Sequence, residues 1–186
     1  MAKKVILFGE LLLRLAPRGV TRFLQAEEFE ARYTGAEANA GVSLANFGME
    51  AYAVSRVPEN EIGQACLNYL NRFRVNTEHV LRGGDRLGLF YLETGVAQRP
   101  SRIIYDRGHS AIRDCGPGSF DWERICAGKD WFHFSGTAPA LGPGVVAALQ
   151  EGLGAARRHG LTVSCDLNYR AKLWSPTEAE RVMTSL

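Results

Sequence analysis

Short apolar runs alternate with segments of helical period along this chain, and this alternation restricts the fold more than any other feature. The apolar runs, each of strand length, are residues 5–8, 51–57, 131–135 and 161–165. Helical periodicity occupies residues 36–47, 62–73 and 145–158, and the capping box SPTE at residues 175–178 starts one more helix. Repeated strand–helix–strand units imply a mostly parallel sheet with helices on both faces. The predicted fold class is therefore α/β.

One segment, residues 86–108, breaks this pattern with two β-rich runs around the turn-rich sequence TGVAQRP. These runs predict an antiparallel hairpin that forms a small lid over one edge of the sheet, with residues 21–33 as its candidate partner. The length of 186 residues suits one domain. We therefore expect one domain over residues 1–186, with lid segments at about 11–33 and 86–108.

Composition excludes several classes of partner. Lys plus Arg is 22 and Asp plus Glu is 20, a balance that does not favour nucleic acid. No apolar run reaches the roughly 20 residues that cross a bilayer, so no membrane partner is expected. Glu10 and Arg14 interrupt the apolar start, which therefore indicates a first strand and not a signal peptide. The four cysteines are scattered without a CxxC pair, which predicts free thiols in a reducing cytoplasm and no metal site.

Ligand-binding side chains follow the last apolar run, in CDLNYRAKLW at residues 165–174. Open parallel sheets bind ligands at the carboxyl ends of their strands. Asp166 and Asn168 suit hydroxyl groups, and the guanidinium of Arg170 suits a carboxylate or phosphate. The alternative is a solvated loop with an ordinary arginine.

The hairpin adds Tyr91, Tyr105 and Arg107. Tyr105 and Arg107 are two residues apart, so they point to the same face, and Tyr91 on the partner strand is expected to face them. Two phenols and a guanidinium suit a polyhydroxylated, negatively charged small molecule. The alternative is a tyrosine-rich edge strand whose charges serve solubility.

A dinucleotide-binding site is a competing interpretation, because GPGVVA at residues 142–147 matches G-x-G-x-x-A and Asp166 lies near the expected offset. However, the preceding strand is expected to end at Ser135, and GTAPAL separates it from the first glycine. The tight turn of a dinucleotide fold is then missing, which favours an ordinary helix start with small residues for close packing.

Together these stretches resemble the ribokinase-like (PfkB) carbohydrate kinases, and most closely the 2-keto-3-deoxygluconate kinases. The resemblance covers nearly the whole chain, through GELLLRLAP, GAEAN, FYLETG, IIYDRGHSAI and DLNYRAKLW. It implies an α/β core with a β lid, phosphorylation of a sugar hydroxyl by ATP and Mg²⁺, and a homo-oligomer formed through the lids.

The resemblance also implies a substrate site for a small-molecule sugar acid. Its residues are Gly35, Tyr91, Tyr105, Arg107 and Arg170, with Ala36 and Asn39 beside them, in addition to Asp166 and Asn168. Small side chains from Gly35 onward would let the backbone approach the sugar. Arg14 stands where ribokinase-type members carry an aspartate, which disfavours a neutral pentose.

The family's GAGD motif, implied to supply the anion hole and the catalytic aspartate, does not occur in these 186 residues, and neither does its NxxE motif. We therefore expect a substrate-binding N-terminal part, truncated before the nucleotide-binding half and inactive alone. No catalytic residue is assigned within it, although Arg170 is a candidate charge stabiliser. The alternatives are a fructokinase-type member, a non-catalytic sugar-binding or dimerising fragment, and an NAD-dependent oxidoreductase.

Overall fold

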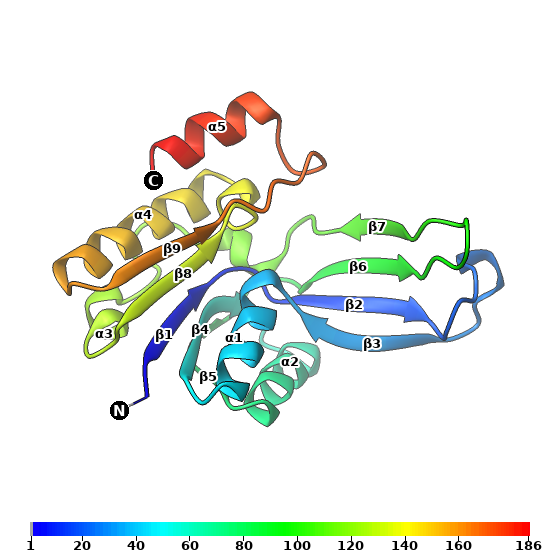
Figure 1. Ribbon diagram of the computed structural model, residues 1–186, viewed down its shortest axis with the longest axis horizontal. Helices are drawn as coiled ribbons and strands as arrows, with labels where there is room; N and C mark the ends of the chain where they lie inside the picture. The colour runs from blue at the N-terminus through cyan, green and yellow to red at the C-terminus, as the bar shows by residue number, and fades with distance from the viewer. Residues whose placement is uncertain (1) are drawn as a thin grey trace.

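A five-stranded parallel sheet forms the centre of the computed structural model, which describes residues 2–186 (Figure 1). Its strands are β1 (Lys4–Phe8), β4 (Glu50–Val57), β5 (Val75–Arg82), β8 (Trp131–Ser135) and β9 (Thr162–Asp166). Their order is β5-β4-β1-β8-β9, and all neighbours run parallel. The apolar runs predict β1, β4, β8 and β9. They miss β5, because Asn76, Thr77 and Glu78 give it a polar middle.

Helices cover both faces of this sheet, which confirms the predicted α/β class (Figure 1). They are α1 (Ala36–Asn46), α2 (Glu61–Arg72), α3 (Trp122–Cys126), α4 (Pro143–Arg158) and α5 (Pro176–Thr184), with short 3-10 helices at Phe23–Gln25, Ala111–Asp114 and Pro139–Leu141. Side chains of β1 alternate between two apolar clusters: Val5 and Leu7 pack with α1 and α2, whereas Ile6 and Phe8 pack with α3 and α4. None of the helices in the described chain combines the length and apolar character needed to cross a membrane.

Local sequence sets where the helices begin. The amide of Glu178 donates to Ser175 Oγ at 3.2 Å, so the predicted cap of α5 is confirmed. The amide of Gly63 donates in the same way to Asn60 Oδ1 at 3.0 Å and caps α2. By contrast, α1 begins after Gly35 with no side-chain cap, which leaves its first backbone amides without a partner of that kind.

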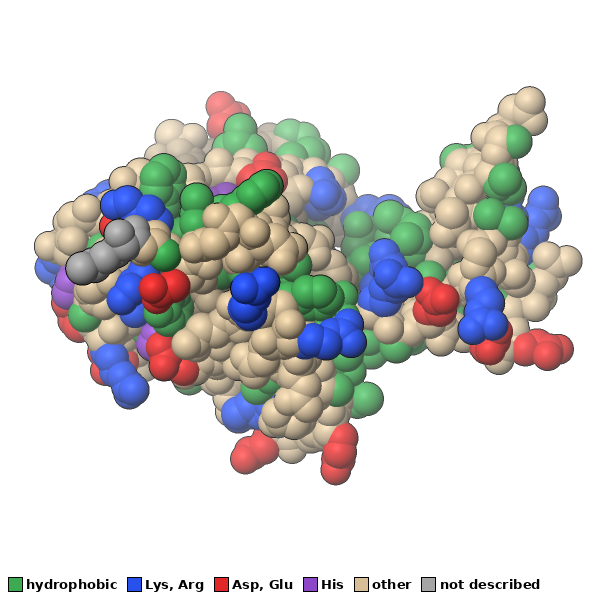
Figure 2. Space-filling model, turned by 60° about the horizontal axis from the view of Figure 1, so that its bottom comes forward, with side chains coloured by type: hydrophobic (Ala, Val, Ile, Leu, Met, Phe, Trp, Pro, Cys, Tyr) green, Lys and Arg blue, Asp and Glu red, His purple; other side chains and the backbone are tan. Residues whose placement is uncertain are grey.

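A second, four-stranded sheet forms the lid, which extends from the rounded body of the core (Figures 1 and 2). Its strands are β2 (Leu12–Pro17), β3 (Phe29–Thr34), β6 (Gly88–Glu93) and β7 (Arg102–Asp106), in the order β3-β2-β6-β7. Strands β6 and β7 are antiparallel, as the hairpin predicts.

The expected partner of this hairpin is wrong. Strand β6 pairs with β2, in parallel, so that Leu12 lies opposite Gly88, and β3 lies on the other side of β2. The reason is the short link through residues 9–11, which joins β1 directly to β2. Because β2 leaves the core at the middle of the core sheet, it takes a central place in the lid, and β3 becomes an edge strand.

Candidate functional site

A polar cleft of about 370 Å³ lies where the carboxyl edge of the core sheet meets the lid. Its lining residues come from both sheets and from α1: Glu10, Leu12, Thr34, Gly35, Ala36, Asn39, Phe90, Tyr105, Arg107, Thr137, Asp166, Asn168 and Arg170. The cleft therefore brings together every residue singled out from the sequence as substrate-binding, except Tyr91.

The α1 wall of the cleft is backbone. Gly35 has φ +153°, a conformation that side chains rarely adopt, and an added Cβ would lie 2.4 Å from the carbonyl oxygen of Glu10. Ala36 follows with only a methyl group, so the start of α1 is open to a ligand. Asn39 accepts a hydrogen bond from Thr34 Oγ1 at 3.0 Å through its Oδ1, which leaves its Nδ2 as a donor.

The lid wall carries Tyr105 and Arg107, as their spacing predicts. The guanidinium of Arg107 is buried and donates through Nε to Glu10 Oε2 at 2.8 Å, with a second donation from Nη2 to the same oxygen. Glu10 is therefore part of the site, although its place at a strand end was the only signal for it in the sequence. Its carboxylate neutralises and fixes Arg107 before any ligand binds.

Tyr91 requires a correction. The register of β6 and β7 places Phe90 opposite Tyr105, with ring centroids 6.0 Å apart, and Tyr91 opposite Ile104. Tyr91 therefore points to the other face of the lid, where its ring meets Phe29 edge-on at 6.1 Å. Successive strand residues face opposite sides, so Phe90 and not Tyr91 lies on the cleft face of β6. The cleft therefore carries a phenyl ring where the sequence predicts a phenol.

The third wall follows β9. The amide of Asn168 donates to Asp166 Oδ1 at 3.0 Å, and Asn168 has φ +38°, so the chain turns sharply at the sheet edge. Arg170 donates to the carbonyl oxygen of Tyr169 at 3.1 Å. Among residues 2–186 it forms no ion pair, unlike Arg107. Arg170 is thus the cleft's cation that is available to an anionic ligand.

Glu37, which follows the cleft residue Ala36 in α1, is a buried carboxyl that sequence reasoning missed. Its side chain is only 3% exposed, and neither carboxyl oxygen has a hydrogen-bond partner in the described chain. Gly9 makes room for it, since an added Cβ there would lie 2.0 Å from Glu37 Oε2. Burial raises the pKa of Glu37 to about 7, and the negative charge of Glu10 adds to the rise. The hydroxyl and amide of Ser135, which lie nearby but outside hydrogen-bond geometry, offset part of it.

The GPGVVA stretch lies away from this cleft. Gly142 precedes α4 and follows the 3-10 helix Pro139–Leu141, so no tight strand-to-helix turn is present. A Cβ on Gly144 would lie 2.4 Å from the carbonyl oxygen of Cys115, so this glycine serves close packing. The part of the chain that the structure describes also holds no group of three or more His, Cys, Asp or Glu residues placed to bind a metal ion.

The fold and cleft define a class of α/β proteins in which a polar cleft lies between a parallel core sheet and a β lid. Residues 2–186 match the model of the pfkB family carbohydrate kinases. The chain belongs to the PfkB family, as the motifs in its sequence indicate.

The chain is similar to several proteins that are named as kinases. The chain is 35% identical to 2-dehydro-3-deoxygalactonokinase of Haloferax volcanii, over 100% of the chain and 58% of that relative. It is 47% identical to the crystal structure of 2-dehydro-3-deoxygluconokinase from Thermotoga maritima, with a TM-score of 0.96 over 98% of the chain and 56% of that structure. A sugar kinase of Pyrococcus horikoshii in complex with ATP shares the fold at 18% identity and a TM-score of 0.80. The chain thus spans little more than half the length of the relatives it matches.

Proposed function

We propose that this chain forms the substrate-binding part of a PfkB kinase for a 2-keto-3-deoxy sugar acid, most closely 2-keto-3-deoxygluconate. The observation that carries the proposal is the position of Arg170 on the same cleft as the side-chain-poor start of α1. A guanidinium without an ion-pair partner matches a carboxylate, and bare backbone amides match hydroxyl oxygens.

Each wall has a distinct role in this proposal. The amides at Gly35 and Ala36 and the Nδ2 of Asn39 bind sugar hydroxyls. Arg170 binds the carboxylate, while Arg107, held by Glu10, presents its remaining N–H groups at a fixed position. Tyr105 covers the sugar from the lid, with its phenol as a further hydrogen-bonding group.

The test is calorimetric titration of this polypeptide with 2-keto-3-deoxygluconate and with fructose. We expect the acid to bind more tightly, and Arg170→Ala to weaken its binding roughly 10- to 100-fold, as loss of a charge-assisted hydrogen bond predicts. The matched control is Arg102→Ala, on β7 but outside the cleft. Tighter binding of fructose, or equal effects of both substitutions, would refute the sugar-acid assignment and favour a fructokinase-type member.

We infer that ATP and Mg²⁺, the cofactors of the family, require residues beyond those of this chain. The GAGD motif, which the family resemblance assigns to the anion hole and the catalytic aspartate, is absent from the sequence. Incubation of this polypeptide with ATP, Mg²⁺ and the sugar acid should therefore yield no ADP. Stoichiometric ADP production would show that another residue acts as the base.

We also propose that a second copy of the chain covers the lid face opposite the cleft. Phe29 and Ile104 are exposed there, at 41% and 54%. Ile104→Asp should shift sedimentation velocity toward the monomer, whereas Ile62→Asp on α2 should not. Identical sedimentation of both variants and the unmodified chain would exclude this interface.

A further inference from the structure

The buried carboxyl of Glu37 has no part in the ligand contacts proposed above. Its side chain is 3% exposed, and its two oxygens have no hydrogen-bond partner among residues 2–186. The carboxyl lies over the backbone of Gly9, because an added Cβ there would lie 2.0 Å from Glu37 Oε2. Burying a polar group without a partner costs free energy. A carboxyl in this position therefore stands to gain from any hydrogen bond within its reach.

The strand register places Ser135 next to this carboxyl. Phe8 lies opposite Phe134 in the pairing of β1 with β8, and both rings pack in the cluster that contains α3 and α4. The next residues, Gly9 and Ser135, therefore stand side by side and face α1. The hydroxyl and amide of Ser135 lower the pKa of Glu37, which agrees with this placement.

The hydroxyl of Ser135 connects the surroundings of Glu37 to the cleft. Ser135 Oγ lies 2.7 Å from Thr137 Oγ1, and either oxygen can be the donor. Ser135 is 1% exposed, whereas Thr137 is one of the residues that line the cleft. A hydroxyl donates one hydrogen and also accepts, so the hydrogen bonds of this pair can run in either direction. Their direction decides whether Thr137 offers a hydrogen or only lone pairs to a ligand.

The protonation state of Glu37 sets this direction. Burial raises the pKa of Glu37 to about 7, so both forms are populated near neutral pH. A small rotation of the carboxyl joins it to Ser135. An ionised Glu37 only accepts, so Ser135 donates to it and Thr137 donates to Ser135. A protonated Glu37 donates to Ser135, which then donates to Thr137, and the hydrogen of Thr137 is released for the cleft.

The neighbouring strands add two carboxylates and one thiol to the surroundings of Glu37. Glu10 follows β1, and its negative charge adds to the raised pKa of Glu37. Asp166 lies opposite Ser135 in the pairing of β8 with β9. Burial, with smaller contributions from Asp166 and Glu37, raises the pKa of Cys165 to about 11. The thiol therefore stays neutral at pH 8.

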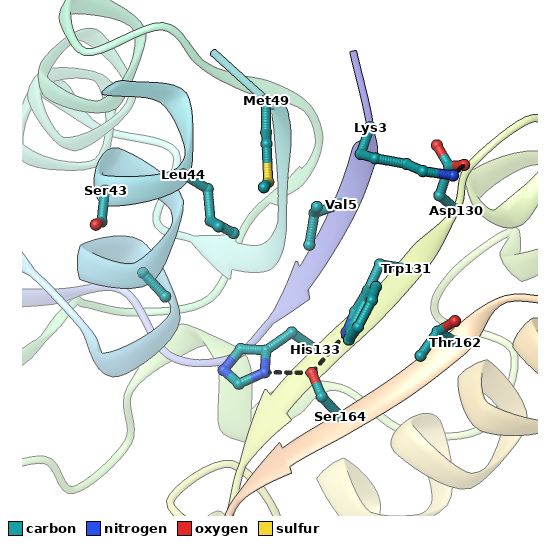
Figure 3. Close-up of a pocket in the computed structure, with 11 residues that line it drawn as sticks. Lys3, Val5, Ser43, Leu44, Met49, Asp130, Trp131, His133, Thr162 and Ser164 are labelled. Atoms are coloured by element: carbon teal, nitrogen blue, oxygen red, sulfur yellow. Dashed lines mark hydrogen bonds and ion pairs between the residues drawn. The ribbon is translucent and has the colours of Figure 1, made fainter. Parts of the chain in front are cut away.

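Three further groups on this side keep one charge state between pH 6.5 and pH 8. Strand β4 carries the uncharged Ser55 at the level of Ser135. Two residues before Ser135, His133 Nδ1 lies 2.8 Å from Ser164 Oγ (Figure 3). Burial lowers the pKa of His133 below its usual 6.5, so its ring is mostly neutral in this range. The guanidinium of Arg107 remains charged throughout.

We propose that Thr137 donates a hydrogen bond to the ligand of the cleft only when Glu37 is protonated, and that Ser135 transmits this state between them. Thr137 is then a further binding residue, and Glu37 is a positioning residue that acts through two hydroxyls. The inference rests on the proposed function, since it takes a sugar acid as the ligand. Ligand binding and proton uptake by Glu37 are coupled, so each strengthens the other by the same factor.

The first measurement needs no ligand. Carbon-13 NMR of the glutamate-labelled chain follows the carboxyl of Glu37 with pH, and loss of a signal in Glu37→Gln identifies it. Thr137→Val should raise the pKa of Glu37, because the ionised carboxylate loses the second hydroxyl of the chain. Thr77→Val is the matched control on β5, where Thr77 donates to Asn71 instead, and should leave the titration unchanged. Equal pKa values of Glu37 in the Thr137→Val and unmodified chains would overturn the inference, whatever the cleft binds.

The second measurement is calorimetric titration with 2-keto-3-deoxygluconate at pH 6.5 and pH 8. The protonated fraction of a group with a pKa of about 7 falls from about three quarters to about one tenth, so the apparent affinity should fall about 8-fold. In Glu37→Gln the amide donates at both pH values, so the affinity should no longer depend on pH. In Thr137→Val the affinity at pH 6.5 should fall to that of the unmodified chain at pH 8.

The outcomes separate this inference from the proposed function. Binding of the acid with one affinity at both pH values would overturn the inference and leave the sugar-acid assignment in place. The same pH dependence in Glu37→Gln as in the unmodified chain would also overturn it. Absence of binding at both pH values would refute the proposed function, and the NMR comparison of Thr137→Val with Thr77→Val would then decide the inference alone. Circular dichroism confirms that each variant is folded.

Discussion

Replacement of Glu37 by glutamine should stabilise the protein at alkaline pH and have little effect at acid pH. In the folded protein the Glu37 carboxyl is buried without a hydrogen-bond partner among residues 2–186, and burial raises its pKa from 4.5 to about 7. Between those values the folded state binds more protons than the unfolded state, so stability falls as pH rises. A shift of this size corresponds to about 3 kcal/mol of folding stability. This stability is present at pH values below the unfolded pKa of 4.5 and is lost as the pH rises above about 7.

The measurement is urea unfolding of the unmodified chain and of Glu37→Gln at pH 5 and pH 8. Because glutamine has nearly the same shape and no charge, the variant should lack the loss between these two pH values and gain about 3 kcal/mol at pH 8. The exposed Glu59, changed to glutamine, controls for the removal of one carboxyl. If Glu37→Gln lost as much stability as the unmodified chain between pH 5 and pH 8, the proposed desolvation of Glu37 would be wrong.

Further substitutions test other parts of the cleft and fold, each by urea unfolding. Gly35→Ala should cost about 1–3 kcal/mol, because it combines strained backbone with a contact at the Glu10 carbonyl, and an unchanged midpoint would contradict the tight turn. Glu10→Ala should cost about 3–5 kcal/mol, because it leaves Arg107 buried without its partner; a loss below ~1 kcal/mol would mean that Arg107 moves to solvent. Asn60→Ala should cost about 1 kcal/mol through loss of the α2 cap, while Asn60→Asp should retain most of the stability.

The sequence predicted four of the five strands of the core sheet and most of the cleft for a simple reason. Strands buried on both faces read as apolar runs, and residues at their carboxyl ends converge without knowledge of side-chain contacts. This reasoning predicted Asp166 and Arg170 as residues of the cleft. The small side chains from Gly35 onward were a further signal, because a position that requires left-handed backbone and close approach admits only glycine.

The remaining features depend on contacts between distant parts of the chain. Whether Phe90 or Tyr91 faces the cleft is set by the pairing of β6 with β7, and no local pattern fixes that register. The pair of Glu10 and Arg107 joins residues 97 positions apart. Glu37 in the first turn of a helix resembles an ordinary solvated carboxylate, and only the fold buries it.

The parallel pairing of β2 with β6 has a consequence for how the protein acquires its structure. Residues 12–15 pair with residues 88–91 across an intervening chain that contains β3, α1, β4, α2 and β5. Closing so large a loop costs entropy before any contact repays it, so the inner pair of lid strands should be among the last to assemble. In refolding experiments, amide protection should therefore appear in β1 and β4 before β2, and the ability to hold a ligand should follow the acquisition of core structure with a measurable delay.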